Sequence, residues 1–435
     1  MSVSVFYRMV HREISQTDSE RSTVQFDPGQ NRPGRRRAPS FPMTKFDFDD
    51  RPFIVIWEVT RACSLACRHC RAEANLSRHP LELTTEESFR FIEQVERCRP
   101  TLFVITGGDP IRRLNLETLI RHATDRDLRV SLSPSATPEF AGADLSAFKQ
   151  AGVERISLSL DGARRETHDR FRGVPGTWNW TMESIANAAI AGIPVQINTT
   201  FTRQNLGEFD EFVRLLDEIR PALWSVFQLV PTGRGKIDDL LTAEEMECLF
   251  ERLAKLSRTA PYDIKTTEGQ HYRRVVLQQA RGQDGFARTR QSEPLPGEKI
   301  ANRPSDIAKP GSRAPLGIND GKGFVFVSHI GNIQPSGFLP LTAGNVRTDE
   351  LLDVYRNSPL FRELRNPGLL KGKCGQCEFK AICGGSRARA YAMTGDYLGA
   401  EPLCVYQPPR NGRREETSVT AQAAGIDPIF PTTDT

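Results

Sequence analysis

The stretch Phe53–Cys70, FIVIWEVTRACSLACRHC, joins a short apolar run to three closely spaced cysteines. The run is rich in β-branched and aromatic residues, which predicts a buried strand. Cys63, Cys67 and Cys70 follow it with the spacing C-x3-C-x2-C, which brings three thiolates around one metal centre in a single loop. A centre that needs four ligands then keeps one position open. In a [4Fe–4S] cluster, the open iron can bind a substrate or cofactor directly.

Five further strand-like runs follow, each separated from the next by a segment of helix length: TLFVITGG, LRVSLSPS, RISLSLDG, PVQINTTF and LWSVFQLV. The segment Thr84–Cys98 is a clear helical pattern, because Thr84 and Glu87 form a capping box ahead of apolar residues at helical spacing. This alternation predicts βαβ units and a parallel sheet. Six repeats are fewer than the eight of a closed barrel, so the predicted fold is α/β, a partial (β/α)6 TIM-type barrel with a small C-terminal extension.

Polar and glycine-rich segments finish or follow most of these strands: CSLACRHC, GGDP, SLDG, NTTFTRQN and VPTGRG. In parallel α/β proteins, functional residues gather at the carboxyl ends of the strands. The sequence therefore predicts one functional site at that edge of the sheet.

The chain has 435 residues and a formal net charge of +4, which is too small to indicate nucleic-acid binding. It lacks a run of eighteen apolar residues and an apolar segment near its N-terminus, so neither a membrane helix nor a secretory signal is predicted. These features favour a cytoplasmic protein without a membrane partner. In that reducing compartment, clustered cysteines bind metal more often than they form disulfides. Zinc with a fourth ligand from His69 or from elsewhere in the chain is the alternative for the first three cysteines.

Composition divides the chain into five parts. The two ends are polar and predicted to be disordered, and Met43 is a candidate for the true start of translation. A loose stretch, Gln279–Lys322, predicts a flexible loop, and GFVFVSHIGNIQPSG predicts a β-hairpin that turns at Gly331–Asn332. The predicted parts are a disordered segment at 1–45, the barrel at 50–260, a connecting region at 261–322, a C-terminal cluster domain at 323–408 and a disordered tail at 409–435.

Four later cysteines have the spacing C-x2-C-x5-C-x20-C: Cys374, Cys377, Cys383 and Cys404. Four thiolates can saturate an iron–sulfur cluster, which would then carry electrons rather than bind a cofactor. Zinc in a four-cysteine structural site is the alternative. Cys98 and Cys248 lie on helical patterns, and we predict that they are buried structural residues.

C-x3-C-x2-C after the first strand of a partial barrel resembles the radical S-adenosylmethionine (radical SAM) superfamily. The resemblance implies that Cys63, Cys67 and Cys70 hold a catalytic [4Fe–4S] cluster whose open iron binds S-adenosylmethionine through its amino and carboxylate groups. Reductive cleavage of this cofactor yields methionine and a 5'-deoxyadenosyl radical, which abstracts a hydrogen atom from the substrate. It also implies a protein reductant such as flavodoxin or ferredoxin.

Other strand ends match the same family. TGGDP resembles its Gly-Gly-Glu-Pro segment, so Gly107, Gly108 and Asp109 would contact the amino group of S-adenosylmethionine, with Asp109 where Glu is usual. Leu229 and Val230 would pack near the adenine.

Ser159 and Asp161 fit the S-x-D-G segment of the family, and Ser133 lies on the third strand. Arg172 is expected to pair with the cofactor carboxylate, and Asn198 to contact the ribose. For each of these polar residues, a turn or cap role is the alternative.

The segment CGQCEFKAICGGSRARAYAMTGDYLGAEPLC resembles the C-terminal cysteine segment of SPASM and twitch extensions. It is most like the haem d1 maturation and alternative haem synthesis enzymes of this family. Ser386 and Ser336 stand where some relatives carry cysteine. The resemblance therefore implies one auxiliary [4Fe–4S] cluster with four cysteine ligands.

The substrate is indicated by KTTEGQHYRRV, which brings His271, Tyr272 and Arg273 together after the barrel. These residues would suit a carboxylate-bearing tetrapyrrole, with His271 as an axial ligand of its iron; a basic solvated helix face is the alternative. An auxiliary cluster suits oxidative decarboxylation or side-chain removal at a propionate. Two other functions stay open: maturation of a ribosomally made peptide, and iron–sulfur or zinc binding without catalysis. The short polar N-terminus favours a small molecule over a peptide.

Overall fold

The computed structural model describes residues 46–288 and 317–409. The predictions of disorder at both ends therefore fall almost entirely outside the described residues. Residues 289–316 of the predicted flexible loop also lie outside the described residues. The beginning of that loop is helical instead, because helix α10 (Tyr272–Arg288) continues through Gln279.

A single sheet forms the centre of the described chain, with the strand order β10-β9-β8-β1-β2-β3-β4-β5-β6-β7. All neighbours from β8 through β1 to β7 are parallel, and β9 pairs antiparallel with β8 and β10. The strands are β1 (Ile54–Glu58), β2 (Leu102–Thr106), β3 (Val130–Leu132), β4 (Val153–Ser159), β5 (Val195–Phe201), β6 (Leu223–Gln228), β7 (Asp263–Thr267), β8 (Phe324–Val327), β9 (Asn332–Gln334) and β10 (Gly344–Asn345).

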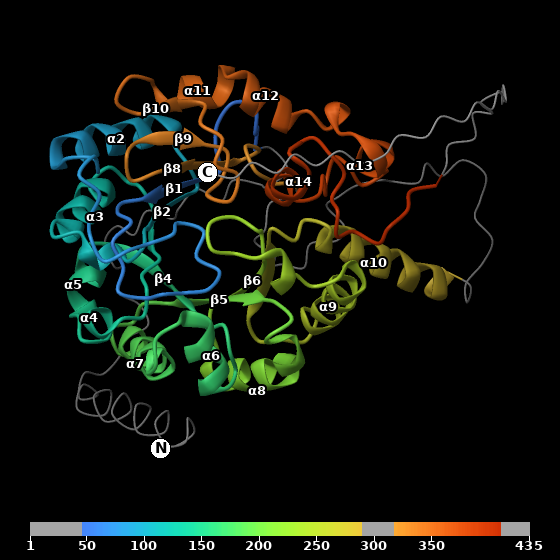
Figure 1. Cartoon of the computed structure of the whole chain (residues 1–435), viewed down its shortest axis with the longest axis horizontal. Helices are drawn as coiled ribbons and strands as arrows, with labels where there is room; N and C mark the ends of the chain where they lie inside the picture. Colours follow the sequence, from blue (N-terminus) through green and yellow to red (C-terminus); the bar gives the residue numbers. More distant parts are fainter. Residues whose placement is uncertain (1–45, 289–316, 410–435) are drawn as a thin grey trace, which may run out of the picture.

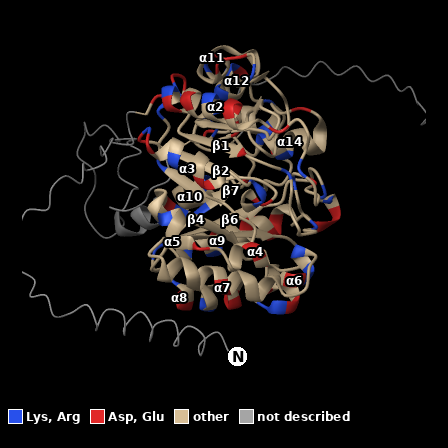
Figure 2. Ribbon diagram, turned by 90° about the vertical axis from the view of Figure 1, so that its left-hand side faces the viewer, with Lys and Arg blue, Asp and Glu red and all other residues tan. Residues whose placement is uncertain are grey.

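Helices lie around the outside of the sheet, as Figure 1 shows. They are α2 (Thr85–Cys98), α3 (Leu116–Thr124), α4 (Pro138–Ala141), α5 (Leu145–Gln150), α6 (Arg165–Arg172), α7 (Thr177–Ile190), α8 (Phe209–Ile219), α9 (Ala243–Leu256), α10, α11 (Leu351–Asn357), α12 (Pro359–Arg365), α13 (Gly372–Gln376) and α14 (Arg387–Thr394). In Figure 2, basic and acidic residues are interspersed over these outer helices, in keeping with the small net charge.

The six predicted strands are β1 to β6, and the predicted α/β class with an unclosed, partial barrel is confirmed. The predicted capping box of Thr84 and Glu87 is present at the start of α2. The sheet extends beyond the six repeats on both sides. Strand β7 continues it past β6, and β8 joins β1, so part of the C-terminal segment belongs to the central sheet.

The core lies between the sheet and the helices. Alternate residues of the strands, such as Val55 and Trp57 in β1, are fully buried there. The ring of Trp57 meets Phe91 of α2 edge to face at 5.2 Å between centroids. The opposite face of β3, β4 and β5 carries polar residues such as Ser131, Ser157 and Asn198, and it leads to the carboxyl edge of the sheet.

The predicted hairpin is formed by β8 and β9. Its turn has His329 and Ile330 at its centre, two positions earlier than predicted, because the amide of Gly331 donates to the carbonyl of Ser328 and Asn332 is already the first residue of β9. Gly331 has a φ of 86°, in the left-handed region that favours glycine. In the part of the chain that the structure describes, no helix is both long and apolar enough to span a bilayer.

Candidate active site

The first three cysteines lie in a loop that follows β1. The side chains of Cys63 and Cys67 are buried and that of Cys70 is half-buried. The loop is fixed by backbone hydrogen bonds, one from Cys63 N to Asn75 O at 2.7 Å. The amide of Leu65 lies 3.4 Å from the Cys63 sulfur, so the loop already presents a donor to one thiolate.

Arg234, in the segment after β6, holds the same loop from the other side. Its Nε donates to the carbonyl of Cys67 at 2.9 Å, and its Nη1 donates to that of Ala74 at 3.0 Å. Its backbone N–H donates to the carbonyl of Cys70 at 3.0 Å. Arg234 was not among the predicted site residues. The only sequence signal for it is its place in VPTGRG at a strand end.

The GGDP segment after β2 packs directly on this loop. The amide of Gly108 donates to Thr60 O, and that of Asp109 donates to Ala62 O, both at 2.7 Å. A Cβ atom at Gly108 would lie 2.5 Å from the carbonyl oxygen of Arg61. Glycine is therefore required by a close approach of two backbones.

The carboxylate of Asp109 is fully buried and serves as a cap. It accepts hydrogen bonds from the hydroxyl of Thr137 at 2.8 Å and the amide of Ser135 at 3.3 Å. Burial raises its pKa to about 6, although these hydrogen bonds act in the opposite direction. The cap role that the sequence left open is thus the one the structure displays.

Ser135 is a further residue at this site that the sequence analysis missed. Its Oγ lies 3.5 Å from the sulfur of Cys63 and donates to the carbonyl of Gly108 at 2.7 Å. It follows β3 by three positions, two residues after Ser133, which was predicted to bind the cofactor. The side chain of Ser133 is half-buried.

Arg172 and Asp161 form an ion pair with 3.1 Å between Nη1 and Oδ2. Both side chains are buried. Burial works to lower the pKa of Arg172, but the nearby Cys67 and the Asp161 carboxylate raise it overall. The Nε2 atom of His69 lies 3.8 Å from Asp161 Oδ2. The structure therefore shows a partner for Arg172 within the protein, beside the cysteine loop.

Ser159 and Asn198 are direct neighbours in the register of β4 and β5, so they share one face at the carboxyl edge. Asn198 Oδ1 accepts from Gln196 at 2.7 Å. Leu229 and Val230, which follow β6, are buried. The predicted cofactor residues thus lie at the strand ends around one edge, as expected from a parallel sheet.

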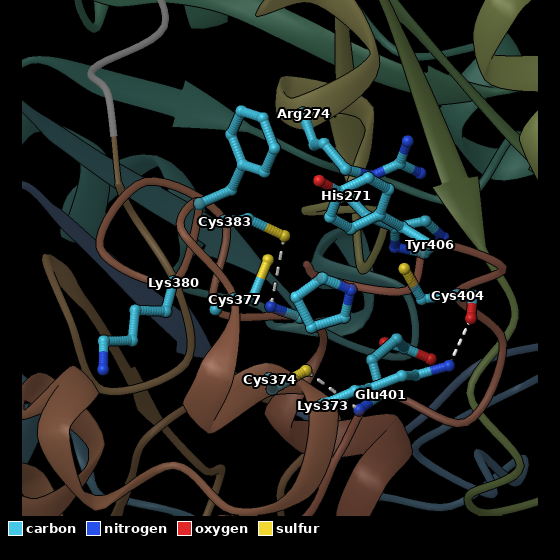
Figure 3. Close-up of a pocket in the computed structure, with 14 residues that line it drawn as sticks. His271, Arg274, Lys373, Cys374, Cys377, Lys380, Cys383, Glu401, Cys404 and Tyr406 are labelled. Carbon is cyan, nitrogen blue, oxygen red and sulfur yellow. Dashed lines mark hydrogen bonds between the residues drawn. The ribbon is translucent and has the colours of Figure 1, made fainter. Parts of the chain in front are cut away.

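The four later cysteines line one pocket, which also contains His271 and Glu401 (Figure 3). Two backbone amides point at its sulfurs: Glu401 N lies 3.3 Å from Cys374 Sγ, and Gly385 N lies 3.4 Å from Cys383 Sγ. Cationic side chains of Arg274, Lys373 and Lys380 also line the pocket. Amides and cations around four thiols suit a site for a negatively charged cluster.

The predicted substrate residues lie at this pocket and in the core, and the solvated helix face proposed as an alternative is not found. His271 is fully buried, and burial lowers its pKa to about 3. Tyr272 packs edge to face on Phe250. Arg273 donates to the carbonyls of Ile382 at 3.0 Å and Ile318 at 2.6 Å. Tyr272 and Arg273 thus have partners within the protein, and His271 lines the cysteine pocket; their contact with a tetrapyrrole stays a prediction.

Ser386 and Ser336, which stand where some relatives carry cysteine, both make hydrogen bonds within the protein. Ser386 caps α14 and donates to Glu268 at 2.5 Å. The Ser336 hydroxyl accepts from the amide of Leu339 at 3.2 Å. Cys98 is buried as predicted, but Cys248 is exposed, because it lies on the outer face of α9.

An open parallel sheet with three cysteines after its first strand defines an iron–sulfur enzyme built on a partial barrel. The signature of the radical SAM superfamily matches residues 57–216. Oleidesulfovibrio alaskensis "AdoMet-dependent heme synthase" is 39% identical over 85% of this chain and 92% of its own length. Dinoroseobacter shibae "Pre-heme d1 synthase" is 26% identical over 81% of this chain and 85% of its own. The chain belongs to the radical SAM superfamily.

Two further similarities bear on the architecture and on the alternatives. The crystal structure of Streptococcus suis SuiB bound to S-adenosylmethionine aligns with a TM-score of 0.58 at 17% identity, over 82% of this chain and 78% of that one, which supports the fold. Mycobacterium ulcerans "Mycofactocin maturase MftC" is 31% identical over 82% of this chain and 88% of its own length. Membership of the superfamily implies a [4Fe–4S] cluster and S-adenosylmethionine. A loop with three cysteines, packed on the Gly108 backbone, fits that cluster.

Proposed function

We propose that this enzyme makes haem by oxidative decarboxylation of propionate side chains on an iron coproporphyrin. The observation that carries the proposal is the similarity to a protein named AdoMet-dependent heme synthase over nearly the full length of both chains. Cys63, Cys67 and Cys70 would hold the catalytic [4Fe–4S] cluster. When bound, this cluster and S-adenosylmethionine supply the 5'-deoxyadenosyl radical.

The chain's residues around the loop would bind and orient the cofactor. Gly107, Gly108 and the strand-end residues Ser133, Ser159 and Asn198 line the edge where it would lie. Leu229 and Val230 offer apolar surface for adenine. Asp109 and the Arg172–Asp161 pair would act by fixing the backbone and charge of this edge, since both are already bonded within the protein.

The proposed reaction balances in atoms and electrons. A propionate R–CH2–CH2–COO⁻ first loses one hydrogen atom from the carbon next to the ring. The resulting substrate radical then loses one electron and CO2, and a vinyl group R–CH=CH2 remains. The electron needs an acceptor, and the second cysteine site is the place in this chain that could hold one.

Cys374, Cys377, Cys383 and Cys404 would bind an auxiliary [4Fe–4S] cluster. Support comes from the pocket, where four sulfurs meet two backbone amides and several cations. A flavodoxin or ferredoxin would reduce the catalytic cluster, in the cytoplasm. Zinc at the second site is the alternative that the iron content tests.

An anionic substrate is supported by one half-buried cation, Lys265, on the sheet face opposite the helices. Arg155 of β4 pairs in register with Ser131, and Lys265 of β7 pairs with Ser225. Burial and the charge of Arg155 lower the pKa of Lys265 to about 8. The described residues give the Lys265 ammonium no carboxylate partner. A propionate of the substrate would supply one.

The test begins with anaerobic reconstitution of the full chain. Two [4Fe–4S] clusters require about eight irons per chain, whereas one cluster with zinc gives about four. Incubation with S-adenosylmethionine, reductant and iron coproporphyrin III should yield 5'-deoxyadenosine and a product that has lost CO2 and two hydrogen atoms per side chain. The matched control is the Cys63→Ala, Cys67→Ala, Cys70→Ala triple variant.

Peptide maturation is the second candidate, because a relative of 31% identity is named a mycofactocin maturase. If iron coproporphyrin is unchanged while a short peptide encoded beside the gene gains a modification that depends on S-adenosylmethionine, the haem proposal is wrong.

A further inference from the structure

His271 is one of the buried polar residues in the described chain whose side chain lacks a hydrogen-bond partner. It directly precedes α10, and no part of its side chain is exposed. Neither Nδ1 nor Nε2 has a hydrogen-bond partner. An unpaired polar group in the interior destabilises the folded state, because its hydrogen bonds to water are lost and not replaced. A buried ring with two unpaired nitrogens therefore indicates that the hydrogen-bond partner is a group bound in the pocket and not another protein residue.

The pocket around His271 identifies the kind of partner. Figure 3 shows His271 among the four cysteines. The polar groups next to it are already bonded elsewhere: Glu401 accepts two hydrogen bonds from Arg389, and Arg274 donates to Glu247. The sulfur atoms at the centre of the pocket are the acceptors that remain.

We propose that His271 donates a ring N–H hydrogen bond to a sulfur of the auxiliary cluster and thereby raises the reduction potential of that cluster. This inference rests on the proposed function, because it needs a [4Fe–4S] cluster on Cys374, Cys377, Cys383 and Cys404. His271 is then a residue that tunes the electron acceptor. It is not a ligand of iron.

The direction of the effect follows from charge. Each electron added to a cluster with four thiolate ligands makes it more negative, and a hydrogen bond to sulfur stabilises the more negative form. Arg274 and Lys373, which line the same pocket, act in the same direction. A higher potential makes the cluster a better acceptor for the electron that a substrate radical must lose.

The test compares four forms of the full-length reconstituted enzyme: wild type, His271→Phe, His271→Gln and the control His122→Phe, which changes a half-buried histidine of α3 that does not line the pocket. Phenylalanine keeps a ring but removes the donor, and glutamine restores an N–H group. Each form is titrated potentiometrically and followed by EPR. The titration is repeated in the Cys63→Ala, Cys67→Ala, Cys70→Ala background, where the auxiliary cluster is observed alone. Pulsed EPR in D2O then measures exchangeable deuterons near that cluster.

We expect His271→Phe to keep the iron content of the wild type, to shift the auxiliary midpoint to lower potential and to lose one deuteron coupling. His271→Gln should recover most of the midpoint potential and of the deuteron coupling, and His122→Phe should match the wild type in both measurements. An unchanged midpoint and coupling in His271→Phe would refute the hydrogen bond. If His271→Phe fails to load iron, the decision falls to His271→Gln: a wild-type midpoint with the coupling present supports the proposal, and failure to load overturns it.

Failure of this inference is separable from failure of the proposed function. Haem formation by the wild type tests the function, whereas the midpoint and the deuteron coupling test His271 whether or not iron coproporphyrin is the substrate. An iron content of about four per chain would remove the auxiliary cluster itself, and with it the role of His271.

Discussion

Gly108→Ala should disable the first cysteine loop without touching a cysteine. The new Cβ would lie 2.5 Å from the carbonyl oxygen of Arg61 and 2.7 Å from that of Ala62. Both atoms belong to backbone, so neither can rotate away. Real Cβ contacts essentially never fall below 3.0 Å, so the loop just before Cys63 must move by about half an ångström.

The magnitude follows from this displacement. Overpacking a fixed interior costs about 1–3 kcal/mol, and here the cost falls on the conformation that binds the first cluster. That corresponds to about 5–150-fold in the loading equilibrium. The hydrogen bonds from Gly108 N to Thr60 O and from Asp109 N to Ala62 O, both 2.7 Å, would also lengthen.

The assay is iron content together with 5'-deoxyadenosine formation after anaerobic reconstitution. Gly108→Ala should retain the iron of the second site, lose most of the iron of the first, and form little 5'-deoxyadenosine. Gly207→Ala is the control, because nothing lies within 4 Å of a Cβ there. Full iron content and wild-type 5'-deoxyadenosine in Gly108→Ala would refute the close-packing argument.

Three further predictions concern charge. Burial raises the pKa of Asp109 to about 6, so the folded state holds this proton more tightly than the unfolded state. As the pH rises from about 4 to about 6, the free energy of unfolding of the wild type should therefore fall by on the order of 3 kcal/mol relative to that of Asp109→Asn, which has no carboxyl group to titrate. Urea unfolding of the two cluster-free proteins across that pH range measures the difference. The same pH dependence of the free energy of unfolding in both proteins would contradict the prediction. Arg389 and Glu401 form a buried bidentate pair at 2.8 and 2.9 Å, so Arg389→Met should lower the free energy of unfolding by about 3–5 kcal/mol. The exposed pair of Lys371 and Asp396 is the control, since Lys371→Met should cost about 0–1 kcal/mol; equal losses would show that burial does not decide the cost. Lys265→Met should lower kcat/KM for an iron coproporphyrin by about 10–150-fold through loss of a charged hydrogen bond of about 1.5–3 kcal/mol, while the surface variant Lys255→Met leaves it unchanged. A wild-type value in Lys265→Met would exclude contact with a propionate.

The elements that sequence could predict are those with strong local signals. Strands β1 to β6 are apolar runs, and α2 begins with a capping box that depends on only four residues. Strand β7 has the sequence DIKTT and no apolar run, so only its pairing with β6 reveals it. Helix α10 runs through two glycines, where propensity alone predicts a loop and packing against α9 outweighs it.

In the candidate site, too, residues in a local pattern could be predicted, and residues that depend on contacts between distant segments could not. The spacing of Cys63, Cys67 and Cys70 is local, so sequence could identify it. Arg234 holds their loop across a separation of more than 160 residues, and no local pattern encodes that contact. His271 was predicted to bind the iron of a tetrapyrrole, and its burial could not be predicted from the sequence because it depends on the C-terminal segment that lines the same pocket.

The C-terminal segment connects the second cysteine site to the sheet that carries the first cysteine loop. Arg389 of α14 donates to the carbonyl of Leu229 at 3.3 Å, just after β6, and to that of Glu268 at 2.9 Å, just after β7. The second site is therefore anchored to the same carboxyl edge at which the first cysteine loop follows β1. The same segment also contacts the residues before β8, because the side chain of Asn319 donates to the carbonyl of Gly385 at 2.8 Å, and β8 is the neighbour of β1 in the sheet. If the four later cysteines bind the proposed cluster, an electron lost by a substrate radical at this edge would have an acceptor in a segment that is bonded to the same edge.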